Sequence, residues 1–478
     1  MLVDTPAHTD VLIVGAGPTG LALAIDLARR GTDALLVERA PALSPGSRGK
    51  GLQPRTLEVL EDLGALEAVR AHAAPYPPLQ LWNGGRPQRE QRMFDAIKPT
   101  QAQPYTQPLM LPQWRTQQVL HERLRALGGR VAFGHELTAL TQDEHGVSAE
   151  FTGGHRVRAR YLVAADGGRS TVRTLLGIGM SGQDVDPQPM VVADLRINGL
   201  DREHWHVFPP TDDQAGGATL ALCPLPGGQD FQLLARHRGT DEIDLTLEGL
   251  RAAVTARTHL HADQIEAVHW ASTFKARTAL ADRFRDRRVL LAGDAAHLHS
   301  PAGGQGLNTS IQDAYNLGWK LDAVLTGTAH TSLLDTYEQE RRPNAAAMLE
   351  LTTAVHHGKA RRGRATAQLD LGYRQSPLSV ETRPDLPEDA LHAGDRAPDG
   401  HHAGTRLFHT LHGPHWTLLT VNTDTELPDA ACPVLRIPTH QAYGTGVFLI
   451  RPDGYIGWAG HTTHGLTTYA TRHGAPIG

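Results

Sequence analysis

The sequence is poor in cysteine and carries little excess charge of either sign. Only Cys223 and Cys432 occur in 478 residues, so a reducing compartment is a simpler expectation than a structural disulfide. The formal net charge is -5, from 46 Lys and Arg against 51 Asp and Glu. That balance gives no electrostatic reason to expect a nucleic-acid partner.

The sequence also lacks a long uninterrupted hydrophobic run. The most apolar stretch, 11–28, contains three glycines, Pro18 and Asp26, which is not typical of a membrane span. The first ten residues show neither the basic nor the apolar region of a signal peptide. We therefore expect a cytoplasmic chain with no membrane partner. The 27 histidines are scattered, and pairs such as His297 and His299 lack further ligands at metal-site spacing, so no metal is predicted.

Composition and pattern divide the chain into four segments. With 40% hydrophobic and 20% charged residues, the chain can bury sizeable cores over two or three domains. Segments 1–179 and 276–390 alternate apolar strand patterns with helical ones, and the latter ends in a helical extension and a linker. Segment 180–275 holds short apolar runs broken by turn signals, which predicts an antiparallel sheet. Segment 391–478 holds further strand patterns.

A strand, a glycine turn, a helix and a second strand are predicted for "DVLIVGAGPTGLALAIDLARRGTDALLVERA", residues 10–40. Gly15 permits the tight turn, Gly17 lets the backbone approach a pyrophosphate, and Gly20 lets the helix pack on the strand. Glu38 ends the second strand, where a carboxylate accepts hydrogen bonds from ribose hydroxyls. The motif predicts a dinucleotide site and leaves NAD and FAD open.

Two later stretches also combine a buried strand pattern with glycines that follow it. In "YLVAADGGRSTVRTLLGI", residues 161–178, a buried strand ends at Asp166; alone, this is also typical of an ordinary strand before a helix capped by Ser170. In "LLAGDAAHLHSPAGGQGLN", residues 290–308, glycines separate a strand from a helical pattern. Glycines in that position predict that a ligand approaches the backbone closely.

Together, "GAGPTG", "DGGRSTVR" and "GDAAHLHSPAGGQGLN" resemble the three fingerprints of the single-component FAD-dependent aromatic hydroxylases. These are the para-hydroxybenzoate hydroxylase-like flavoprotein monooxygenases, and the likeness is greatest to the polyketide and phenol hydroxylase branch. Order and spacing agree over about the first 340 residues. "AGDRAPDG" and "LIRPDGYIGW" resemble that branch's C-terminal domain.

The resemblance implies an α/β fold in four parts. A Rossmann-like FAD-binding domain would comprise 1–179 and 276–390. An antiparallel β-sheet substrate-binding domain would be inserted at 180–275, and a thioredoxin-like domain would occupy 391–478. This tail has no Cys-x-x-Cys motif, which makes redox exchange doubtful. A packing or dimer-forming role, and hence a candidate homodimer, is the alternative.

The resemblance also implies an FAD site, residue by residue. Asp294 would bind the ribityl chain, and the backbone after Pro301 would pass the isoalloxazine ring. Arg48 would lie near the flavin, Leu137 would offer backbone near adenine, and Asp166 would serve both FAD and pyridine-nucleotide use. The full predicted cofactor set is Gly15, Gly17, Thr19, Gly20, Glu38, Arg39, Arg48, Gln113, Leu137, Asp166, Asp294, Gly304, Gly306, Leu307 and Asn308.

The implied reaction consumes NADPH or NADH and O₂. The nicotinamide reduces FAD, O₂ adds to give a C4a-hydroperoxyflavin, and an aromatic ring takes the terminal oxygen. No second G-x-G-x-x-G occurs, so NAD(P)H has no domain of its own. No catalytic residue is predicted, and His297 and His299 are interpreted as capping or packing groups. The pocket is expected between flavin and middle sheet, with four candidate lining residues: Trp82, Trp205, Phe208 and Phe231.

We therefore expect hydroxylation of a phenolic or polycyclic aromatic, polyketide-like substrate. One alternative keeps the chemistry but inactivates an antibiotic or performs a Baeyer-Villiger oxidation. Another is a flavin-binding protein without turnover, although retention of three FAD motifs argues against it. A flavin-dependent halogenase is disfavoured because the W-x-W-x-I-P signature is absent.

Overall fold

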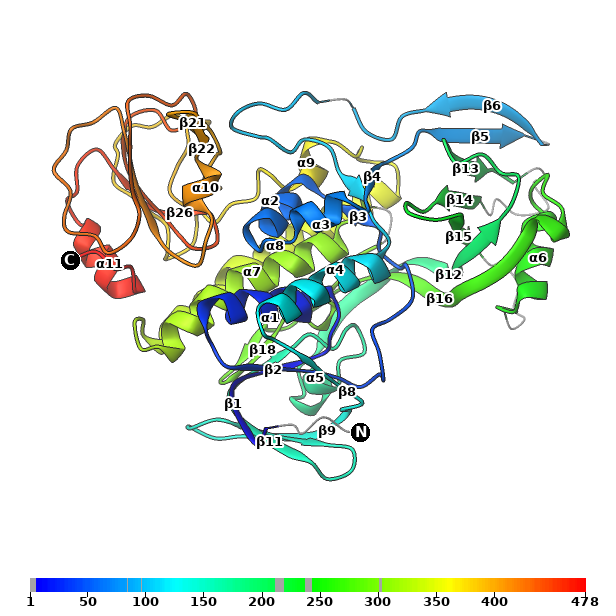
Figure 1. The fold of residues 1–478 in the computed structure, drawn as a ribbon, viewed down its shortest axis with the longest axis horizontal. Helices are drawn as coiled ribbons and strands as arrows, with labels where there is room; N and C mark the ends of the chain where they lie inside the picture. Colours follow the sequence, from blue (N-terminus) through cyan, green and yellow to red (C-terminus); the bar gives the residue numbers. More distant parts are fainter. Residues whose placement is uncertain (1–5, 84, 96, 211–218, 237–242, 301–302) are drawn as a thin grey trace.

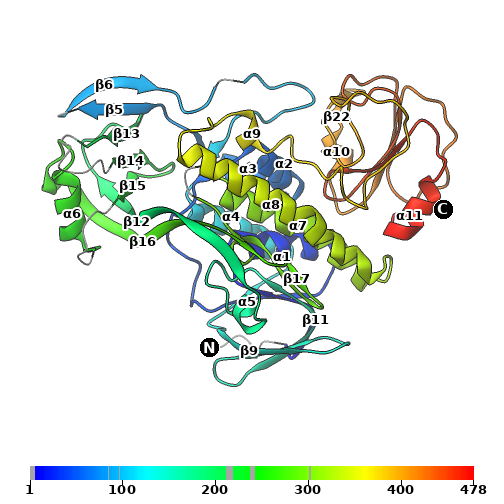
Figure 2. The same cartoon turned by 180° about the vertical axis from the view of Figure 1, so that it is seen from behind.

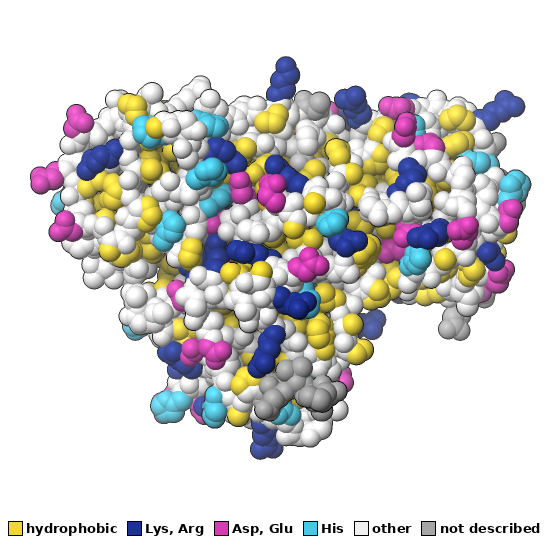
Figure 3. Space-filling view, viewed as in Figure 1, with side chains coloured by type: hydrophobic (Ala, Val, Ile, Leu, Met, Phe, Trp, Pro, Cys, Tyr) yellow, Lys and Arg dark blue, Asp and Glu magenta, His cyan; other side chains and the backbone are white. Residues whose placement is uncertain are grey.

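The computed structural model describes residues 6–83, 85–95, 97–210, 219–236, 243–300 and 303–478. A central α/β body is flanked by the middle sheet at one end and by the C-terminal part at the other (Figure 1). On the face drawn in Figure 3, basic and acidic side chains are interspersed. Within the described residues, no helix has the length and apolar character needed to cross a bilayer.

The central body is built on a mainly parallel sheet. Its path runs β17-β18-β11-β1-β2-β8, and an antiparallel hairpin, β9 and β10, extends it. The strands are β1 (His8–Val14), β2 (Ala34–Glu38), β8 (Val131–Phe133), β9 (Leu137–Gln142), β10 (Val147–Phe151), β11 (Arg156–Ala164), β17 (Arg285–Asp286) and β18 (Val289–Leu291). The carboxyl ends of β1, β2, β11 and β18 therefore meet at one edge, where ligands of such sheets bind.

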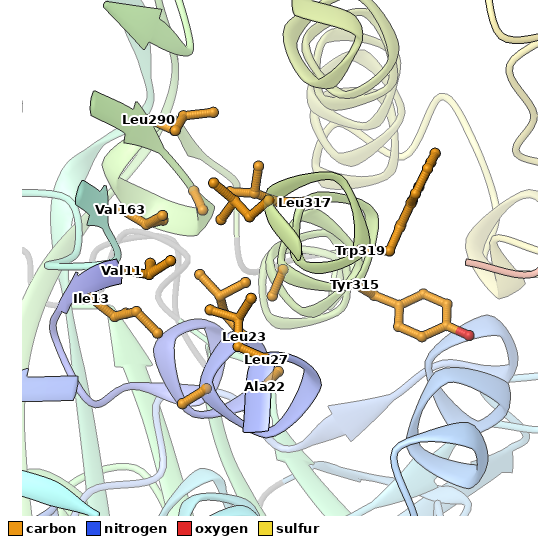
Figure 4. Packing of buried hydrophobic residues seen from close by; sticks show 14 of the residues in the cluster. Val11, Ile13, Ala22, Leu23, Leu27, Val163, Leu290, Tyr315, Leu317 and Trp319 are labelled. Carbon is orange, nitrogen blue, oxygen red and sulfur yellow. The ribbon is translucent and has the colours of Figure 1, made fainter. Parts of the chain in front are cut away.

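Two long helices, α1 (Pro18–Arg30) and α7 (Gly306–Leu325), pack together against this sheet. Leu23 of α1 and Leu317 of α7 point toward Val163 and Leu290 on the strands (Figure 4). The helices approach closely because Gly318 has no side chain; a Cβ there would lie 2.1 Å from a carboxylate oxygen of Asp26. Burying this apolar face fixes both helix N-termini relative to the strand ends.

The middle sheet has eight strands in the order β19-β16-β12-β15-β14-β13-β5-β6. They are β19 (His297–Leu298), β16 (Ile265–Ala281), β12 (Met180–Ile197), β15 (Asp230–Arg236), β14 (Leu220–Pro224), β13 (Trp205–Phe208), β5 (Leu79–Asn83) and β6 (Arg86–Gln91). All neighbours are antiparallel except β13 and β5. The antiparallel sheet expected from the sequence is present, and β5 and β6 extend it from an earlier part of the chain.

The C-terminal part holds a five-stranded sheet in the order β20-β26-β25-β23-β24. Strands β23 (Thr417–Val421) and β24 (Val434–Ile437) are parallel, while β25 (Gly446–Ile450) and β26 (Ile456–Gly460) return antiparallel and α11 (Leu466–His473) follows. This order is the core of a thioredoxin-like fold. Helices α7 and α8 (Asp335–His356) run side by side toward it (Figure 2). The predicted α/β fold class is confirmed.

Further helices and strands connect these parts within the described residues. They are β3 (Gly51–Leu52), α2 (Pro54–Asp62), α3 (Leu66–Arg70), β4 (Ala74–Pro75), β7 (Leu109–Met110), α4 (Gln113–Ala126), α5 (Thr171–Leu175), α6 (Leu247–Thr255), α9 (Arg364–Ala367), β20 (Val380–Glu381), β21 (His401–His402), β22 (Thr405–Arg406) and α10 (Phe408–Leu411).

Candidate active site

The three glycines of the first turn have distinct roles in the structure. Gly15 has φ 106°, and a Cβ there would lie 2.4 Å from the Ala165 carbonyl oxygen. A Cβ at Gly20 would lie 2.0 Å from the Gly15 carbonyl oxygen, so glycine lets α1 pack against the turn. Nothing lies within 4 Å of a Cβ at Gly17. The helix start thus leaves open space where its free N–H groups favour a phosphate.

The carboxylate of Glu38 lies beside this turn. One of its oxygens accepts the Ala16 N–H at 2.9 Å and the other accepts the Ala40 N–H at 3.0 Å. Each oxygen keeps a further lone pair for a hydroxyl. Arg39 is exposed next to it, and Leu137 is buried where β9 begins. The chain before Leu137 runs along the same strand end, because the His135 N–H donates to the Glu38 carbonyl at 2.9 Å.

The second and third motifs meet the first at the same sheet edge. A Cβ on Gly15 would lie 2.9 Å from the Asp166 Cα, which places the second motif against the glycine turn. A Cβ on Gly293, whose φ is 62°, would lie 2.5 Å from the Thr19 hydroxyl oxygen. Three segments far apart in sequence therefore surround one place, as the resemblance of the three motifs implied.

Two carboxylates at this place have hydrogen-bonding capacity left. Oδ2 of Asp166 accepts the Val172 N–H at 3.2 Å, the Ser170 hydroxyl also interacts with this carboxylate, and lone pairs remain on it for a further donor. Burial raises the pKa of Asp166. Asp294 retains exposed surface, and desolvation by the surrounding protein also raises its pKa, so this carboxylate is accessible but partly enclosed. Both suit the hydroxyl groups of a flavin dinucleotide.

The start of α7 forms the second half of the site. Gly304 is exposed with φ 63°, and Gly306 begins the helix, whose first N–H groups have no helical acceptor. The Asn308 side chain is used internally: Oδ1 accepts the Gln53 N–H at 2.7 Å, and Nδ2 donates to the carbonyls of Gly51 and Gly304, each at 2.9 Å. A contact from Asn308 to a flavin would therefore use its backbone. Pro301, also singled out from the sequence, lies outside the described residues.

The loop around Arg48 joins α4 and α7 at this place. Gln113, the first residue of α4, accepts the Gly49 N–H at 3.0 Å. A Cβ on Gly49 would lie 3.7 Å from the Leu307 Cβ. Arg48 itself is exposed, and its guanidinium reaches the Ser272 hydroxyl of β16 at 3.4 Å. The structure thus brings the loop, Gln113 and Leu307 together between the two large sheets.

The two histidines of the third motif belong to a buried chain of side chains. Nε2 of His297 lies 2.6 Å from the Asp313 carboxylate, and its Nδ1 lies 3.0 Å from Nε2 of His299. Burial lowers the pKa of His299 well below its usual value, so this ring is neutral at physiological pH. A Cβ on Gly306 would lie 3.5 Å from the His299 Cβ. Packing beside the start of α7, rather than helix capping, describes both rings.

Only one of the four candidate lining aromatics faces the cofactor side of the middle sheet. Trp205 clusters with Met110 and Cys223. Phe208 and Phe231 belong to a separate core, and Trp82 packs against it, with its ring centre 5.6 Å from that of Phe208. The expectation for these three is corrected: they lie on the opposite face of the middle sheet from Trp205, because side chains alternate between the two faces of a strand.

A polar group on the cofactor side was not predicted. Asp194 of β12 pairs with Gln232 of β15, so both side chains share one face. Lys50 enters that face from the Arg48 loop and donates to the Gln232 side-chain oxygen. Only two weak features of the sequence pointed to this polar group. They are a lysine among the glycines of "SRGKGL" and one aspartate inside the apolar run "VVADLRI".

Comparison with known proteins agrees with this geometry. Residues 8–352 match the family model described as an FAD binding domain, and 391–476 match the aromatic-ring hydroxylase C-terminal model. A flavin-dependent monooxygenase of Mycobacteroides abscessus is 41% identical over 97% of this chain and 99% of its own. A 12-dehydrotetracycline 5-monooxygenase/anhydrotetracycline 6-monooxygenase of Streptomyces rimosus is 36% identical over 96% and 97%.

A solved structure extends the likeness to the whole fold. The anhydrotetracycline hydroxylase OxyS of Streptomyces rimosus superposes with a TM-score of 0.77 at 33% identity, covering 98% of this chain and 100% of that one. The resemblance drawn from the three motifs is confirmed, as is FAD as the cofactor. The chain belongs to the family of FAD-dependent aromatic-ring hydroxylases and is a flavoprotein monooxygenase.

Proposed function

We propose that this monooxygenase hydroxylates a phenolic or polycyclic aromatic substrate, with NADPH or NADH as reductant and O₂ as oxygen donor. The observation that carries the proposal is the short loop 46–50. Arg48 and Gly49 adjoin the predicted FAD-binding site, while the Lys50 ammonium lies over the ring of Trp205 on one face of the middle sheet. The Streptomyces rimosus relatives, whose names place them on tetracycline precursors, support a polycyclic ring system.

In this proposal the chain holds and orients the reactants. FAD, when bound, supplies electron transfer and oxygen activation. The open N-terminus of α1 at Gly17 would bind its phosphates, Glu38 a ribose and Asp294 the ribityl chain. The first N–H groups of α7, at Leu307 and Asn308, would stabilise negative charge on the reduced ring. Apolar groups around Trp205 would keep water from the reacting atoms.

The test is reduction of the purified holoprotein without oxygen. NADH and NADPH are compared with and without a panel of phenols and polycyclic hydroxyquinones, and products formed under isotopically labelled O₂ are analysed by mass spectrometry. We expect one aromatic class to accelerate flavin reduction and to gain one labelled oxygen as a hydroxyl. A ring-expanded lactone would instead indicate Baeyer-Villiger chemistry. Failure to retain or restore a yellow cofactor would overturn the proposal.

We also infer a homodimer located in the cytoplasm, with four domains divided at 179/180, 275/276 and 390/391. The tail supports a packing role, since it docks through buried ion pairs and its Cys432 stands without a second cysteine nearby in sequence. Light scattering of the full chain and of a tail variant tests the dimer. A monomer at micromolar concentration would contradict it.

A further inference from the structure

A segment that belongs to none of the large sheets lies between the predicted FAD-binding site and the tail. It consists of α9 and the chain that follows it, residues 364–376, and is called the connecting segment below. It falls between the parts of the chain that the two family models match, and α9 lies between the middle sheet and the tail (Figure 1 and Figure 2). Two of its side chains, Gln368 and Tyr373, are only 1% and 4% exposed. Their contacts show what the segment holds in place.

Gln368 holds the loop 303–308, at the start of α7, through a second buried glutamine. Its Nε2 donates to Oε1 of Gln305 at 2.6 Å and to the Thr309 hydroxyl at 3.2 Å. Gln305 donates its own Nε2 to the Gly303 carbonyl at 2.8 Å and to the Thr366 carbonyl at 3.2 Å. Both ends of the Gln305 amide therefore bind the connecting segment, and one of its N–H groups also fixes the backbone of its own loop.

The backbone of Gln368 supports the same interpretation. Its φ is 61°, in the left-handed region that is unfavourable for a residue with a side chain. Such a conformation persists only where surrounding contacts fix it, and it commonly marks a functional position. A further contact is present here, because Oε1 of Gln368 accepts from Nε2 of Gln312 on α7 at 2.5 Å. The strained backbone thus directs the Gln368 amide at α7 and the loop before it.

Tyr373 reaches the other half of the site through Arg341 of α8. Nη1 of Arg341 donates to the Tyr373 hydroxyl at 2.9 Å, and Nε donates to Oδ1 of Asp313 at 2.7 Å. The second oxygen of Asp313 accepts the Gly293 N–H at 3.0 Å. Burial raises the pKa of Tyr373 well above its usual value, so the guanidinium meets a neutral hydroxyl group. Two buried side chains therefore link Tyr373 to the loop that presents Asp294.

The tail holds the connecting segment from the opposite side. The Tyr373 N–H donates to the Gly394 carbonyl at 2.7 Å, and the Tyr373 ring centre lies 4.4 Å from that of Tyr455. Nε of Arg396 donates to the Leu369 carbonyl at 3.4 Å. Tyr373 thus has its backbone and ring against the tail, while its hydroxyl group accepts a hydrogen bond from α8. A displacement of the tail would move both Tyr373 and the chain beside Gln368.

We propose that Gln368 and Tyr373 are positioning residues of the FAD site, through which the tail fixes the loop 303–308 and the loop that presents Asp294. Neither side chain touches FAD in this arrangement; each acts through Gln305 or Arg341. Docking of the tail raises the affinity for FAD, and bound FAD strengthens the docking by the same factor, because such coupling is reciprocal. The proposal rests on the FAD site and the function proposed above and gives the tail a part in both.

The first test compares two buried tyrosines that each lose one hydroxyl group. Tyr373→Phe removes an acceptor of Arg341 and keeps the ring against Tyr455. Tyr443→Phe is the matched control, because that hydroxyl donates to the Pro398 carbonyl at 2.9 Å within the core of the tail. FAD affinity is measured by fluorescence titration of the apoprotein. We expect it to fall about threefold to tenfold in Tyr373→Phe and to stay at the wild-type value in Tyr443→Phe.

Gln368→Met provides a second test that does not depend on Tyr373. It keeps the length of the side chain and removes the hydrogen bonds to Gln305 and Thr309. The first N–H groups of α7 should then lose their fixed position, so they stabilise negative charge on the reduced ring less well. We expect a more negative reduction potential of bound FAD in Gln368→Met and an unchanged one in Tyr443→Phe, as measured by dye-coupled reduction of the holoprotein. A loss of folding stability alone does not move this potential.

The reciprocal effect is measured in the tail of the full chain. Amide hydrogen exchange of β25 and β26 is followed with and without FAD. We expect FAD to slow this exchange by a larger factor in wild type and Tyr443→Phe than in Tyr373→Phe. Equal FAD affinity and equal potential in wild type, Tyr373→Phe and Gln368→Met would overturn the proposal. So would an equal effect of FAD on the exchange of the tail in wild type and Tyr373→Phe.

These outcomes are distinct from failure of the proposed hydroxylase function. Weaker FAD binding in Tyr373→Phe than in Tyr443→Phe, without any oxygenated aromatic product from wild type, would support the coupling and remove the function. Hydroxylation by wild type, with equal FAD affinity and equal potential in every variant, would keep the function and overturn the coupling.

Discussion

One carboxylate oxygen of Asp313 holds both the backbone of Gly293 and the imidazole of His297. Oδ2 accepts the Gly293 N–H at 3.0 Å and lies 2.6 Å from Nε2 of His297, while Oδ1 accepts from Nε of Arg341 at 2.7 Å. All three side chains are fully buried. Asp313 lies on α7, so the helix whose start is predicted to face the flavin also fixes the loop that presents Asp294.

Asp313→Asn should therefore destabilise the fold and weaken FAD binding together. Breaking a buried charge pair from one side costs about 3–5 kcal/mol, because Arg341 is left without its counter-charge. We expect a lowered free energy of unfolding in urea and faster release of FAD, followed by flavin fluorescence. The exposed Asp370→Asn, which breaks only a surface pair with Arg364, is the control and should leave both nearly unchanged.

The same carboxylate should contribute to acid unfolding. Burial alone would raise the pKa of Asp313, but His297 and Arg341 outweigh it and lower the pKa from 3.8 to about 2. A lowered carboxyl pKa gives stability that is present above pH 3.8 and is lost as the pH falls through about 2. Wild type should lose stability across that window more steeply than Asp313→Asn. Equal slopes would show that Asp313 is not ionised in the folded state.

Two alanine substitutions in the first turn should have opposite consequences. Gly17 has φ -70° and open space around it, so Gly17→Ala should leave the unfolding of the apoprotein nearly unchanged. Its methyl group would intrude where the pyrophosphate is expected, and FAD affinity should fall by tenfold or more, as measured by fluorescence titration. Gly20→Ala should instead unfold or strongly destabilise the apoprotein, because its Cβ would meet the Gly15 carbonyl oxygen at 2.0 Å. If both variants melted alike, the separate roles assigned to the two glycines would be wrong.

The three motifs singled out from the sequence lie together in the structure. Gly15, Asp166 and Gly293 each follow a buried strand, and parallel strands bring their carboxyl ends to one edge. The middle sheet was predicted less completely. Its strand β6 is exposed at every residue, so no alternation marked it as part of a sheet.

Which side chains of the middle sheet share the face of Trp205 depends on the register of its strands, and a single sequence does not show that register. A slip of one residue moves every side chain of a strand to the other face, and this is why Phe231 was placed with Trp205 although its neighbour Gln232 faces the loop 46–50. The contact between Lys50 and Gln232 spans 182 residues and joins a loop to a strand. No periodicity or motif relates two such positions.

The tail should depend on Arg451 for its attachment. Its guanidinium binds both oxygens of Glu340 on α8, at 2.6 and 2.9 Å, and Asp453 beside it at 2.5 Å, all fully buried or nearly so. Arg451→Met should lower the free energy of unfolding by about 3–5 kcal/mol, since two carboxylates lose their shared partner. Calorimetry should show the tail melting earlier than the flavin-binding body. The exposed Arg364→Met should not produce this separation; an unchanged single transition in Arg451→Met would contradict the role of the pair.

Asp194 should make the folded protein less stable at neutral pH than it would be without the charge. Burial raises its pKa from 3.8 to about 6, partly offset by Ser47 and Lys50. A raised carboxyl pKa means that this group favours folding below pH 3.8 and that the advantage is lost as the pH rises through about 6.

Asp194→Asn should therefore raise the free energy of unfolding at pH 8 by up to about 3 kcal/mol, from 1.36 kcal/mol per pKa unit. Urea unfolding at pH 5 and pH 8 measures the difference, and an equal pH dependence in wild type and variant would contradict it.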